Sequence, residues 1–337
     1  MSKYSVRFLN QQQFKLWDSF VEQEEGGSVF FKTEWLSNIY LHYNNRISLS
    51  ILVCINNKNN QLVGGIAFGH QKKLGLNIMI PPVATPYSGV VIASRDTEYL
   101  SKKLSQQNEI LELLIQELNN NFHHISLVLP PDIKDIRVFT WNKFKAKPLY
   151  TYFTKTLSKN EVNNWSPSIR RQIKKSAKQP IKYEKGINNK LISHFYELQE
   201  LSFKRQKHTF KFSLDSFQCF IKEISKTNKI EIYIAYYEEK AASAQVIVYH
   251  QNQAYYWLAG ANPKYLNTGI NQGLMKEVFD NFGHKNITHF DFIGANTPGI
   301  AEYKASYNYT LIPYFHITKN IGFFAKSLFF LKKIMNI

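Results

Sequence analysis

The chain has 337 residues, of which 44% are hydrophobic and 15% aromatic, which excludes a disordered chain and allows two domains of ordinary size. There are 42 Lys and Arg residues against 25 Asp and Glu, a formal charge of +17. Such a charge attracts anions: nucleic acid, phosphorylated substrates or an acidic membrane face. Alternatively, a coding bias toward Lys, Asn and Ile raises the charge without any function.

The sequence predicts a cytoplasmic protein. It has no apolar signal-peptide core at its start and no apolar run long enough to span a bilayer. Two cysteines, Cys54 and Cys219, cannot build a disulfide framework, and both are expected to be buried free thiols in a reducing compartment. The ten histidines show no metal-ligand spacing, so no metal site is predicted.

Hydrophobic periodicity and turn residues predict alternating strands and helices in the first half of the chain. Phe14, Trp17, Phe20 and Val21 fall at helical spacing after a possible N-cap at Asn10. The expected strands are 4–9, 47–55, 61–70, 76–82 and 124–130, and the expected helices are 10–23, 33–43 and 97–119.

The second half repeats this pattern. The expected helices are 191–206, 215–227 and 271–283, and the expected strands are 230–237, 241–250, 253–261 and 287–294. The repeat indicates two copies of one α+β domain, although two unrelated mixed domains would also fit. We expect an N-terminal domain at 1–150, a C-terminal domain at 151–320, and a basic amphipathic tail at 321–337.

A basic helix is expected just after the first half, with Ser166 as its cap and Pro167 at its first position. Four basic residues within two turns disfavour a helix through repulsion, and a bound anion would remove that cost. A pyrophosphate, a nucleotide or a tRNA backbone would fit, and a solvated basic face is the alternative. The four residues are Arg170, Arg171, Lys174 and Lys175.

The order helix, helix, three antiparallel strands, helix, strand resembles the GNAT acyltransferase fold. In that fold the fourth and fifth strands splay apart to admit an acyl donor, and here 253–261 and 287–294 would form the splay. The loop before the next helix would bind the donor's phosphates at the helix N-terminus. Of the family's loop pattern only Gly269 is present; Asn267 and Asn271 flank it, and the latter stands where the family has Gly or Ala.

Four segments in order, SIRRQIKKSAK, LSFKRQ, LAGANPKYLNTGINQGLM and FDFIGANTPGIAEYKASYNYTLIPY, resemble the Fem-like branch of this superfamily, which has duplicated acetyltransferase domains. That branch includes Fem peptidyltransferases, which add amino acids from aminoacyl-tRNA to peptidoglycan precursors, and proteins associated with envelope polysaccharides. The long helical hairpin that some Fem enzymes use for tRNA contact is absent from this sequence.

The resemblance implies transfer of an acyl or aminoacyl group by direct attack of an amine, with acyl-CoA or aminoacyl-tRNA as donor and no metal. Lys304 would supply positive charge near the acyl carbonyl or a donor phosphate, and Asp291 would accept a proton or position the amine. Tyr303 would offer a hydroxyl contact. Alternatively, Asp291 caps a loop, Lys304 is a solvated helix lysine, and Tyr303 packs.

The resemblance also implies a donor site and an acceptor site. Donor-binding candidates are Asn267, Gly269, Asn271, Arg170, Arg171 and Lys174; acceptor-binding candidates are Tyr87, Gly89, Arg205 and Gln206. The acceptor would be an anionic small molecule or a lipid-linked envelope precursor or amino sugar. A non-catalytic GNAT pair that binds a membrane-linked anion or a nucleic acid is the alternative function.

The tail NIGFFAKSLFFLKKIMNI carries phenylalanines and lysines in an amphipathic pattern. Such a segment can lie on the inner face of an anionic membrane, or it can dock on the protein's own core. The sequence leaves both alternatives open, and it does not indicate the oligomeric state.

Overall fold

The structure is a computed structural model that describes residues 2–43, 46–94, 97–158, 160–210 and 212–322. The chain divides into two compact units. The first contains the described residues up to Leu149 and those from Pro313, and the second spans 150–312. The expected C-terminal domain ran to residue 320, whereas the chain from Pro313 groups with the first unit. Most of the expected amphipathic tail lies outside the described residues.

The first unit follows the predicted order of elements. Its helices are α1 (Phe14–Gln23), α2 (Thr33–Tyr43), α3 (Leu100–Asn121) and α4 (Arg137–Trp141), with short 3-10 turns at Gln11–Gln13 and Val29–Phe31. Its strands are β1 (Tyr4–Phe8), β2 (Ser48–Asn56), β3 (Gln61–Lys73), β4 (Leu76–Ile80), β5 (Gly89–Ile92) and β6 (His124–Val128). Two further strands, β7 (Lys145–Thr154) and β13 (Thr310–Asn320), contain the points at which the chain divides.

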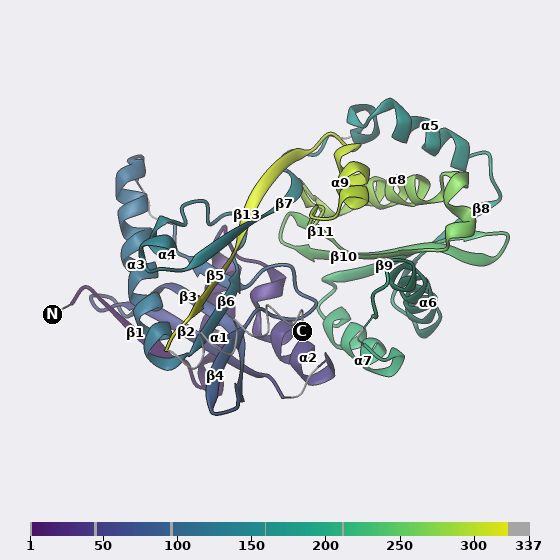
Figure 1. Cartoon of the computed structure of the whole chain (residues 1–337). Coiled ribbons are helices and arrows are strands. Elements are labelled where there is room, and N and C mark those ends of the chain that lie inside the picture. The colour runs from purple at the N-terminus through teal and green to yellow at the C-terminus, as the bar shows by residue number, and fades with distance from the viewer. Residues whose placement is uncertain (1, 44–45, 95–96, 159, 211, 323–337) are drawn as a thin grey trace. The chain divides into compact units, whose positions relative to one another are not determined.

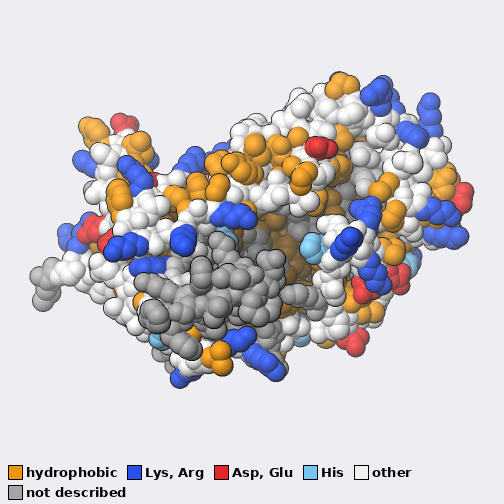
Figure 2. Space-filling view, in the orientation of Figure 1, with side chains coloured by type: hydrophobic (Ala, Val, Ile, Leu, Met, Phe, Trp, Pro, Cys, Tyr) orange, Lys and Arg blue, Asp and Glu red, His pale blue; other side chains and the backbone are white. Residues whose placement is uncertain are grey.

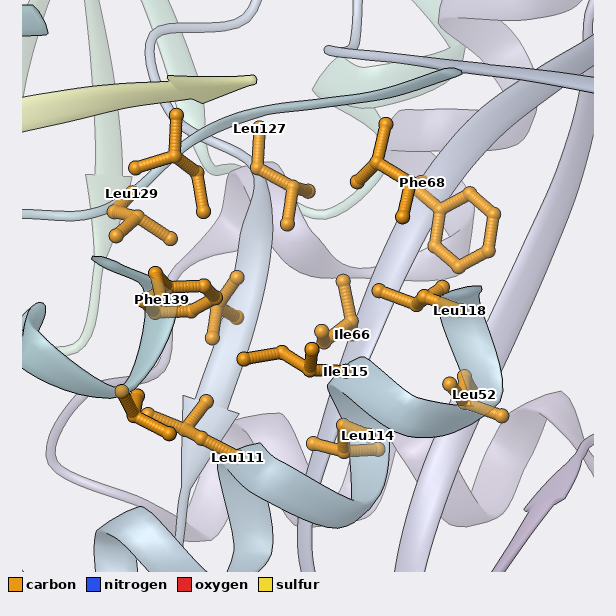
Figure 3. Close-up of a cluster of buried hydrophobic side chains, with 14 of the residues drawn as sticks. Leu52, Ile66, Phe68, Leu111, Leu114, Ile115, Leu118, Leu127, Leu129 and Phe139 are labelled. Atoms are coloured by element: carbon orange, nitrogen blue, oxygen red, sulfur yellow. The ribbon is translucent and has the colours of Figure 1, made fainter. Parts of the chain in front are cut away.

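The sheet of the first unit has the order β1-β2-β3-β4-β6-β13, with β5 paired to β3. Neighbours are antiparallel except β4 and β6, which run parallel. Helix α3 connects this parallel pair and covers one face of the sheet, where Leu111, Leu114 and Ile115 are buried. Figure 3 shows Leu114 and Ile115 turned toward Leu52 and Ile66 of the strands, and Leu111 on the side of Phe139.

The second unit repeats the order of the first. Its helices are α5 (Pro167–Ser176), α6 (Asn189–Arg205), α7 (Leu214–Ser225), α8 (Ile270–Phe282) and α9 (Pro298–Ala305), with 3-10 turns at Glu161–Asn164, Pro263–Thr268 and Gly283–Lys285. Its strands are β8 (Ile181–Gly186), β9 (Ile230–Tyr237), β10 (Lys240–His250), β11 (Gln253–Ala261) and β12 (His289–Asp291), beside the end of β7.

The sheet of the second unit has the order β7-β12-β11-β10-β9-β8. It is antiparallel except for β11 and β12, which are parallel and connected by α8. Helices α6 and α7 cover one face and α5 and α8 the other (Figure 1). On the α8 face, Leu274, Met275 and Val278 are fully buried with Phe290 in an aromatic-rich core.

The predicted fold class is confirmed: both units are α+β domains of one type, each with a mixed, mostly antiparallel sheet flanked by helices. In each, a strand and two helices precede the central antiparallel strands, and a helix then crosses to a parallel strand. Within the described residues, no helix is long and apolar enough to cross a bilayer.

One expectation about the cysteines is wrong. Cys54 is buried on β2 as expected, but Cys219 is exposed. Helix α7 places Phe217, Phe220 and Ile221 against the core. Cys219 lies on the other side of the helix. Its apolar neighbours in the sequence had suggested that it would be buried with them.

Candidate active site

The central feature of the second unit is a splay between two parallel strands. Strands β11 and β12 pair over three residues each, ending at Tyr255 opposite Asp291. Beyond that point β11 continues to Ala261, while the chain after β12 follows β7 instead, since the N–H of Phe292 donates to the carbonyl of Tyr152 (3.0 Å). One edge of β11 therefore has no partner in β12 over its last residues, as the resemblance to the GNAT fold implied.

A bulge in β11 lies at the start of this splay. Tyr256 pairs with Ile247 and Leu258 pairs with Val246, so Trp257 has no opposite residue on β10. Bulges bend a strand and redirect its side chains. Here the indole of Trp257 packs toward Phe217 and Phe220 of α7, while Tyr256 packs in the core on the α8 face.

Asp291 ends β12 and fixes the turn that follows. Its buried carboxylate oxygen Oδ1 accepts hydrogen bonds from the hydroxyl of Thr151 (2.7 Å) and from the N–H of Ile293 (2.8 Å). Ile293 and Gly294 then adopt left-handed backbone conformations, with φ of 49° and 70°. A β-branched residue rarely adopts such a conformation, so the turn needs outside support.

Lys304 of α9 provides that support. Its ammonium donates to the carbonyl oxygens of Phe292 (2.7 Å), Ile293 (2.8 Å) and Gly294 (2.5 Å), which uses its three N–H groups. The side chain is only 6% exposed, so it is not a solvated helix lysine. Burial lowers the pKa of Lys304 to about 8, and the negative charge of Asp291 acts in the opposite direction.

The ring of one tyrosine faces this lysine, and two other tyrosines bond to each other close by in the chain. Tyr256 lies with its ring centroid 5.8 Å from the Lys304 ammonium, and the hydroxyls of Tyr303 and Tyr307 are 2.8 Å apart. Burial raises the pKa of Tyr256 and of Tyr303 well above its usual value, so both hydroxyls stay protonated. Tyr256 follows the last residue of β11 that pairs with β12, so this tyrosine lies at the start of the splay and its hydroxyl remains a hydrogen-bond donor.

Gly269 stands at the start of α8 and has two reasons to be glycine. Its φ is 81°, in the left-handed region. A Cβ atom at this position would also lie 2.2 Å from the carbonyl oxygen of Gln172 on α5. Asn267 belongs to the 3-10 turn before it, and Asn271 lies in the first turn of α8. The loop that was predicted to bind the donor therefore enters α8 through a left-handed glycine, with α5 packed closely against it.

Side-chain amides converge at this helix start. Gln245 of β10 is 1% exposed, and its Nε2 donates to the carbonyl of Asn271 (3.4 Å). Three amide oxygens here are buried without a hydrogen-bond partner in the described part of the chain: those of Gln172, Gln245 and Asn271. A bound molecule that carries N–H donors would satisfy them.

The basic helix forms as predicted. The Oγ atom of Ser166 accepts from the N–H of Ile169 (3.4 Å), and Pro167 follows the cap. Ile169 and Ile173 are buried, so the basic residues lie on the opposite, exposed side. They are Arg170, Arg171, Lys174 and Lys175, and Figure 2 shows basic side chains gathered where Figure 1 places α5.

The acceptor candidates divide between the two units. In the first unit Tyr87 is 2% exposed and packs edge-on against Tyr314 at 5.2 Å, and Gly89 begins β5 beside Ala67. In the second unit Arg205 ends α6 and Gln206 is its C-cap, and both are exposed. The structure therefore brings together Asp291, Lys304 and Tyr303 at one place and the donor candidates around α8 at another.

Several residues of the site were not predicted, among them Thr151, Gln172 and Gln245. The first two carried no distinctive signal, because both lie in mixed polar segments. Gln245 did carry a signal in the sequence, because it is the only side-chain amide within an apolar strand, AASAQVIVYH. A buried polar residue in such a strand needs a partner. Among the described residues, no three His, Cys, Asp or Glu side chains cluster as a metal site.

Comparison with known proteins shows which family this part of the chain is similar to. Residues 166–305 match the family model described as an acetyltransferase (GNAT) domain. No curated protein matches the sequence. The splay, the helix that begins at Gly269 and the loop that Lys304 supports all fall inside the matched segment.

Solved structures resemble the chain over nearly its whole length. A crystal structure of FemX has a TM-score of 0.66 at 12% identity, covering 92% of this chain and 96% of its own. A C-terminal domain of a putative lysylphosphatidylglycerol synthetase from Agrobacterium fabrum has a TM-score of 0.55 at 8% identity, with coverages of 95% and 96%. A tandem GNAT protein of clavulanic acid biosynthesis has a TM-score of 0.52 at 8% identity, with coverages of 94% and 99%. The expected Fem-like, tandem GNAT fold is confirmed.

Proposed function

We propose that the protein transfers an acyl or aminoacyl group from an activated donor to an amine, because residues 166–305 match the family model of the GNAT acetyltransferase domain. The splay between β11 and β12 carries this proposal, since it leaves one edge of β11 without a partner in β12 beyond Tyr255. The proposed acceptor is an amine of an envelope precursor or of an amino sugar.

The reaction would be a direct transfer. The amine nitrogen attacks the acyl carbon, the bond from that carbon to the donor's sulfur or oxygen breaks, and the proton that the amine loses ends on the departing sulfur or oxygen as a thiol or hydroxyl. An N–H on the free edge of β11 is suited to stabilise the oxyanion. Lys304 and Asp291 would act by holding the loop 292–294 in place, because their polar atoms are already bound to main-chain and side-chain groups of the protein.

Two donors remain candidates. GNAT proteins use acyl-CoA, and the pantetheine arm of CoA carries amide N–H groups that could satisfy the amide oxygens of Gln172, Gln245 and Asn271. The exposed arginines of α5 could bind the phosphates of CoA or of an aminoacyl-tRNA. The close contact of Gln172 with Gly269 restricts how deeply a pyrophosphate can enter at α8.

The test is a thermal stabilisation series followed by a transfer assay. Acetyl-CoA, longer acyl-CoAs, aminoacyl-tRNA with uncharged tRNA as control, and UDP-linked sugars and peptides are each added to the whole protein. A binder at 100 times its Kd should stabilise the fold by about 2.7 kcal/mol. Donors that stabilise the protein are then supplied with a labelled acyl group, and transfer of the label to an amine acceptor is measured. Transfer should rise with pH as the acceptor amine loses its proton.

A non-catalytic function is the second candidate, because α5 presents four exposed basic residues next to the donor loop. In that case the protein binds a membrane-linked anion or a nucleic acid and transfers nothing. Binding of anions without label transfer, and without any effect of substitution at Lys304, would favour this function over the enzyme.

A further inference from the structure

A serine of α6 closes the far end of the unpaired edge of β11. The N–H of Ala261 donates to the Oγ atom of Ser202 at 2.9 Å, and that hydroxyl donates to the carbonyl of Ala261 at 3.4 Å. The next N–H along the chain, that of Asn262, donates to the carbonyl of Ala242 on β10 (2.9 Å). Since successive residues of a strand turn their N–H groups to opposite edges, Ala261 turns its N–H and C=O away from β10, to the edge that β12 has left.

Ala259 faces the same edge and is not closed in this way. It lies two residues before Ala261 and beyond the bulge at Trp257, so its N–H and C=O point to the same edge. Strand β12 pairs with β11 only as far as Tyr255, and no bond to the Ala259 N–H is found among the described residues. Ala259 is partly exposed. Between the bulge and Ser202, the edge therefore offers one open N–H.

Helix α6 is held closely against β11 at this point. A Cβ atom at Gly260 would lie 2.5 Å from the main-chain nitrogen of Gln199 and 2.5 Å from the carbonyl carbon of Leu198, so the main chain of the helix lies directly on the strand. Ser202 follows Gln199 by three residues, which places the two on one face of the helix, and both are buried. The hydroxyl is therefore held at the edge by the packing of a whole helix.

The first unit closes its corresponding gap with its own main chain. Strands β4 and β6, the parallel pair joined by α3, pair at Ile78 and His124. Farther along β6, the N–H of Ser88 donates to the carbonyl of Val128 (2.7 Å), and the Ser88 hydroxyl accepts from the N–H of Val128 (3.0 Å). In the second unit Ser202 closes only the end of the gap and leaves part of the edge open.

We propose that Ser202 is a positioning residue that fixes where the acyl carbonyl of the donor binds on β11. With Ala261 closed, the carbonyl oxygen accepts from the N–H of Ala259 alone, so the donor is bound at one position along the strand. Without the hydroxyl, the N–H of Ala261 offers a second position about 7 Å farther along, out of reach of an amine placed to attack at Ala259. The identity of the ligand rests on the proposed transfer, whereas the closing of the edge by Ser202 can be tested without a ligand.

The first experiment is hydrogen exchange of the free protein labelled with ¹⁵N-alanine, in which Ala259→Gly and Ala261→Gly assign the two signals. In the wild type the N–H of Ala261 should exchange about tenfold more slowly than that of Ala259, because only the former is hydrogen-bonded. Ser202→Ala should remove this difference, and Ser202→Thr should restore it. Ser193→Ala, the same change on α6 where the hydroxyl accepts from Gln218, is the control and should alter neither signal. Equal exchange at the two alanines of the wild type, or no effect of Ser202→Ala, would overturn the proposal.

The second experiment measures transfer from acetyl-CoA or from aminoacyl-tRNA, whichever stabilises the protein. Ser202→Ala should lower kcat and the KM for the donor by the same factor, about twofold or more, because binding at the second position is non-productive. Ser202→Thr should behave as the wild type. A fall in kcat/KM for Ser202→Ala, or a donor that stabilises the protein without shifting the Ala259 signal, would contradict the positioning role. If neither donor stabilises the protein, the transferase function fails, and the exchange experiment alone decides whether Ser202 closes the edge.

Discussion

Asp291 and Lys304 bind the main chain of the same residue, Ile293. The carboxylate of Asp291 accepts from its N–H at 2.8 Å, and the ammonium of Lys304 donates to its carbonyl at 2.8 Å. The two charged groups thus hold a left-handed turn at the end of the splayed strand β12. Since this turn directs the chain away from β11, the shape of the proposed donor cleft depends on both residues.

Replacement of Lys304 tests this dependence. Lys304→Met keeps the apolar stem but leaves three buried carbonyl oxygens without their donor, so we expect a loss of roughly 1–3 kcal/mol in the free energy of unfolding. Acyl transfer should fall at least tenfold while the sheet remains intact. Urea unfolding and the labelled-transfer assay measure the two effects. Lys276→Met on α8, where the lysine is exposed, is the control and should change neither.

The buried lysine also predicts a pH dependence of stability. The pKa of Lys304 is about 8 in the folded protein and near 10.5 when exposed in the unfolded chain. Between these values the unfolded chain binds more protons at this position, so its contribution to the free energy of unfolding rises with pH. The difference between the wild type and Lys304→Met should therefore rise by up to about 3 kcal/mol from pH 8 to 10.5 and stay constant below pH 8. A difference that stays flat across that range would show that the pKa is not lowered.

Asp291 and Thr151 form a second test of the same loop. Asp291→Ala removes the acceptor of two buried hydrogen bonds and should cost about 2 kcal/mol of unfolding free energy, whereas Thr151→Val removes one donor and should cost about 1 kcal/mol. Asp291→Asn removes the charge that raises the pKa of Lys304, so the rise in stability with pH should begin at a lower pH than in the wild type. Equal pH profiles in the two proteins would contradict the coupling.

The sequence predicted the order of elements well, because both halves repeat the same periodicities. Strand 253–261 was predicted with its observed bounds, and the splay with strand β12 followed from the family pattern. Short or polar strands were missed: β5 lies in a loop-like segment, β8 is rich in lysine, and β13 contains Pro313. Periodicity is weak in such strands, and their pairing depends on contacts distant in sequence.

The site was predicted less completely than the fold. Asp291 and Lys304 were identified as candidates, but their shared contact with Ile293 depends on a left-handed turn that no local signal indicates. Gly269 could be read as a helix start, yet its close approach to Gln172 involves a helix nearly a hundred residues earlier in the chain. Contacts of this kind depend on how whole helices and strands pack together. The local patterns of a single sequence do not predict them.

Gly269→Ala should disrupt the packing of α5 against α8. The added methyl group requires a left-handed conformation that costs about 1–2 kcal/mol and would also collide with the Gln172 carbonyl. We expect a loss of at least about 2 kcal/mol in unfolding free energy together with weaker donor binding. Gly299→Ala is the matched control, because a Cβ atom there has open space on α9 and should leave stability unchanged or slightly higher.

The exposed face of α5 gives the last prediction, which separates the two candidate functions. Arg170→Gln combined with Arg171→Gln should weaken binding of a phosphate-bearing donor about tenfold and make the Kd less sensitive to salt, because two cations that release counterions are lost. Lys178→Gln, also exposed but beyond the end of α5, is the control and should have a smaller effect.

If the protein is a transferase, the double variant should lose transfer at low donor concentration and regain it at high concentration, since Lys304 and the splay are unchanged. If it only binds anions, the double variant should lose binding whereas Lys304→Met should retain it. Titration of both variants with the same donor at two salt concentrations, together with the transfer assay, therefore distinguishes an enzyme whose basic helix recruits the donor from a protein whose basic helix is the whole site.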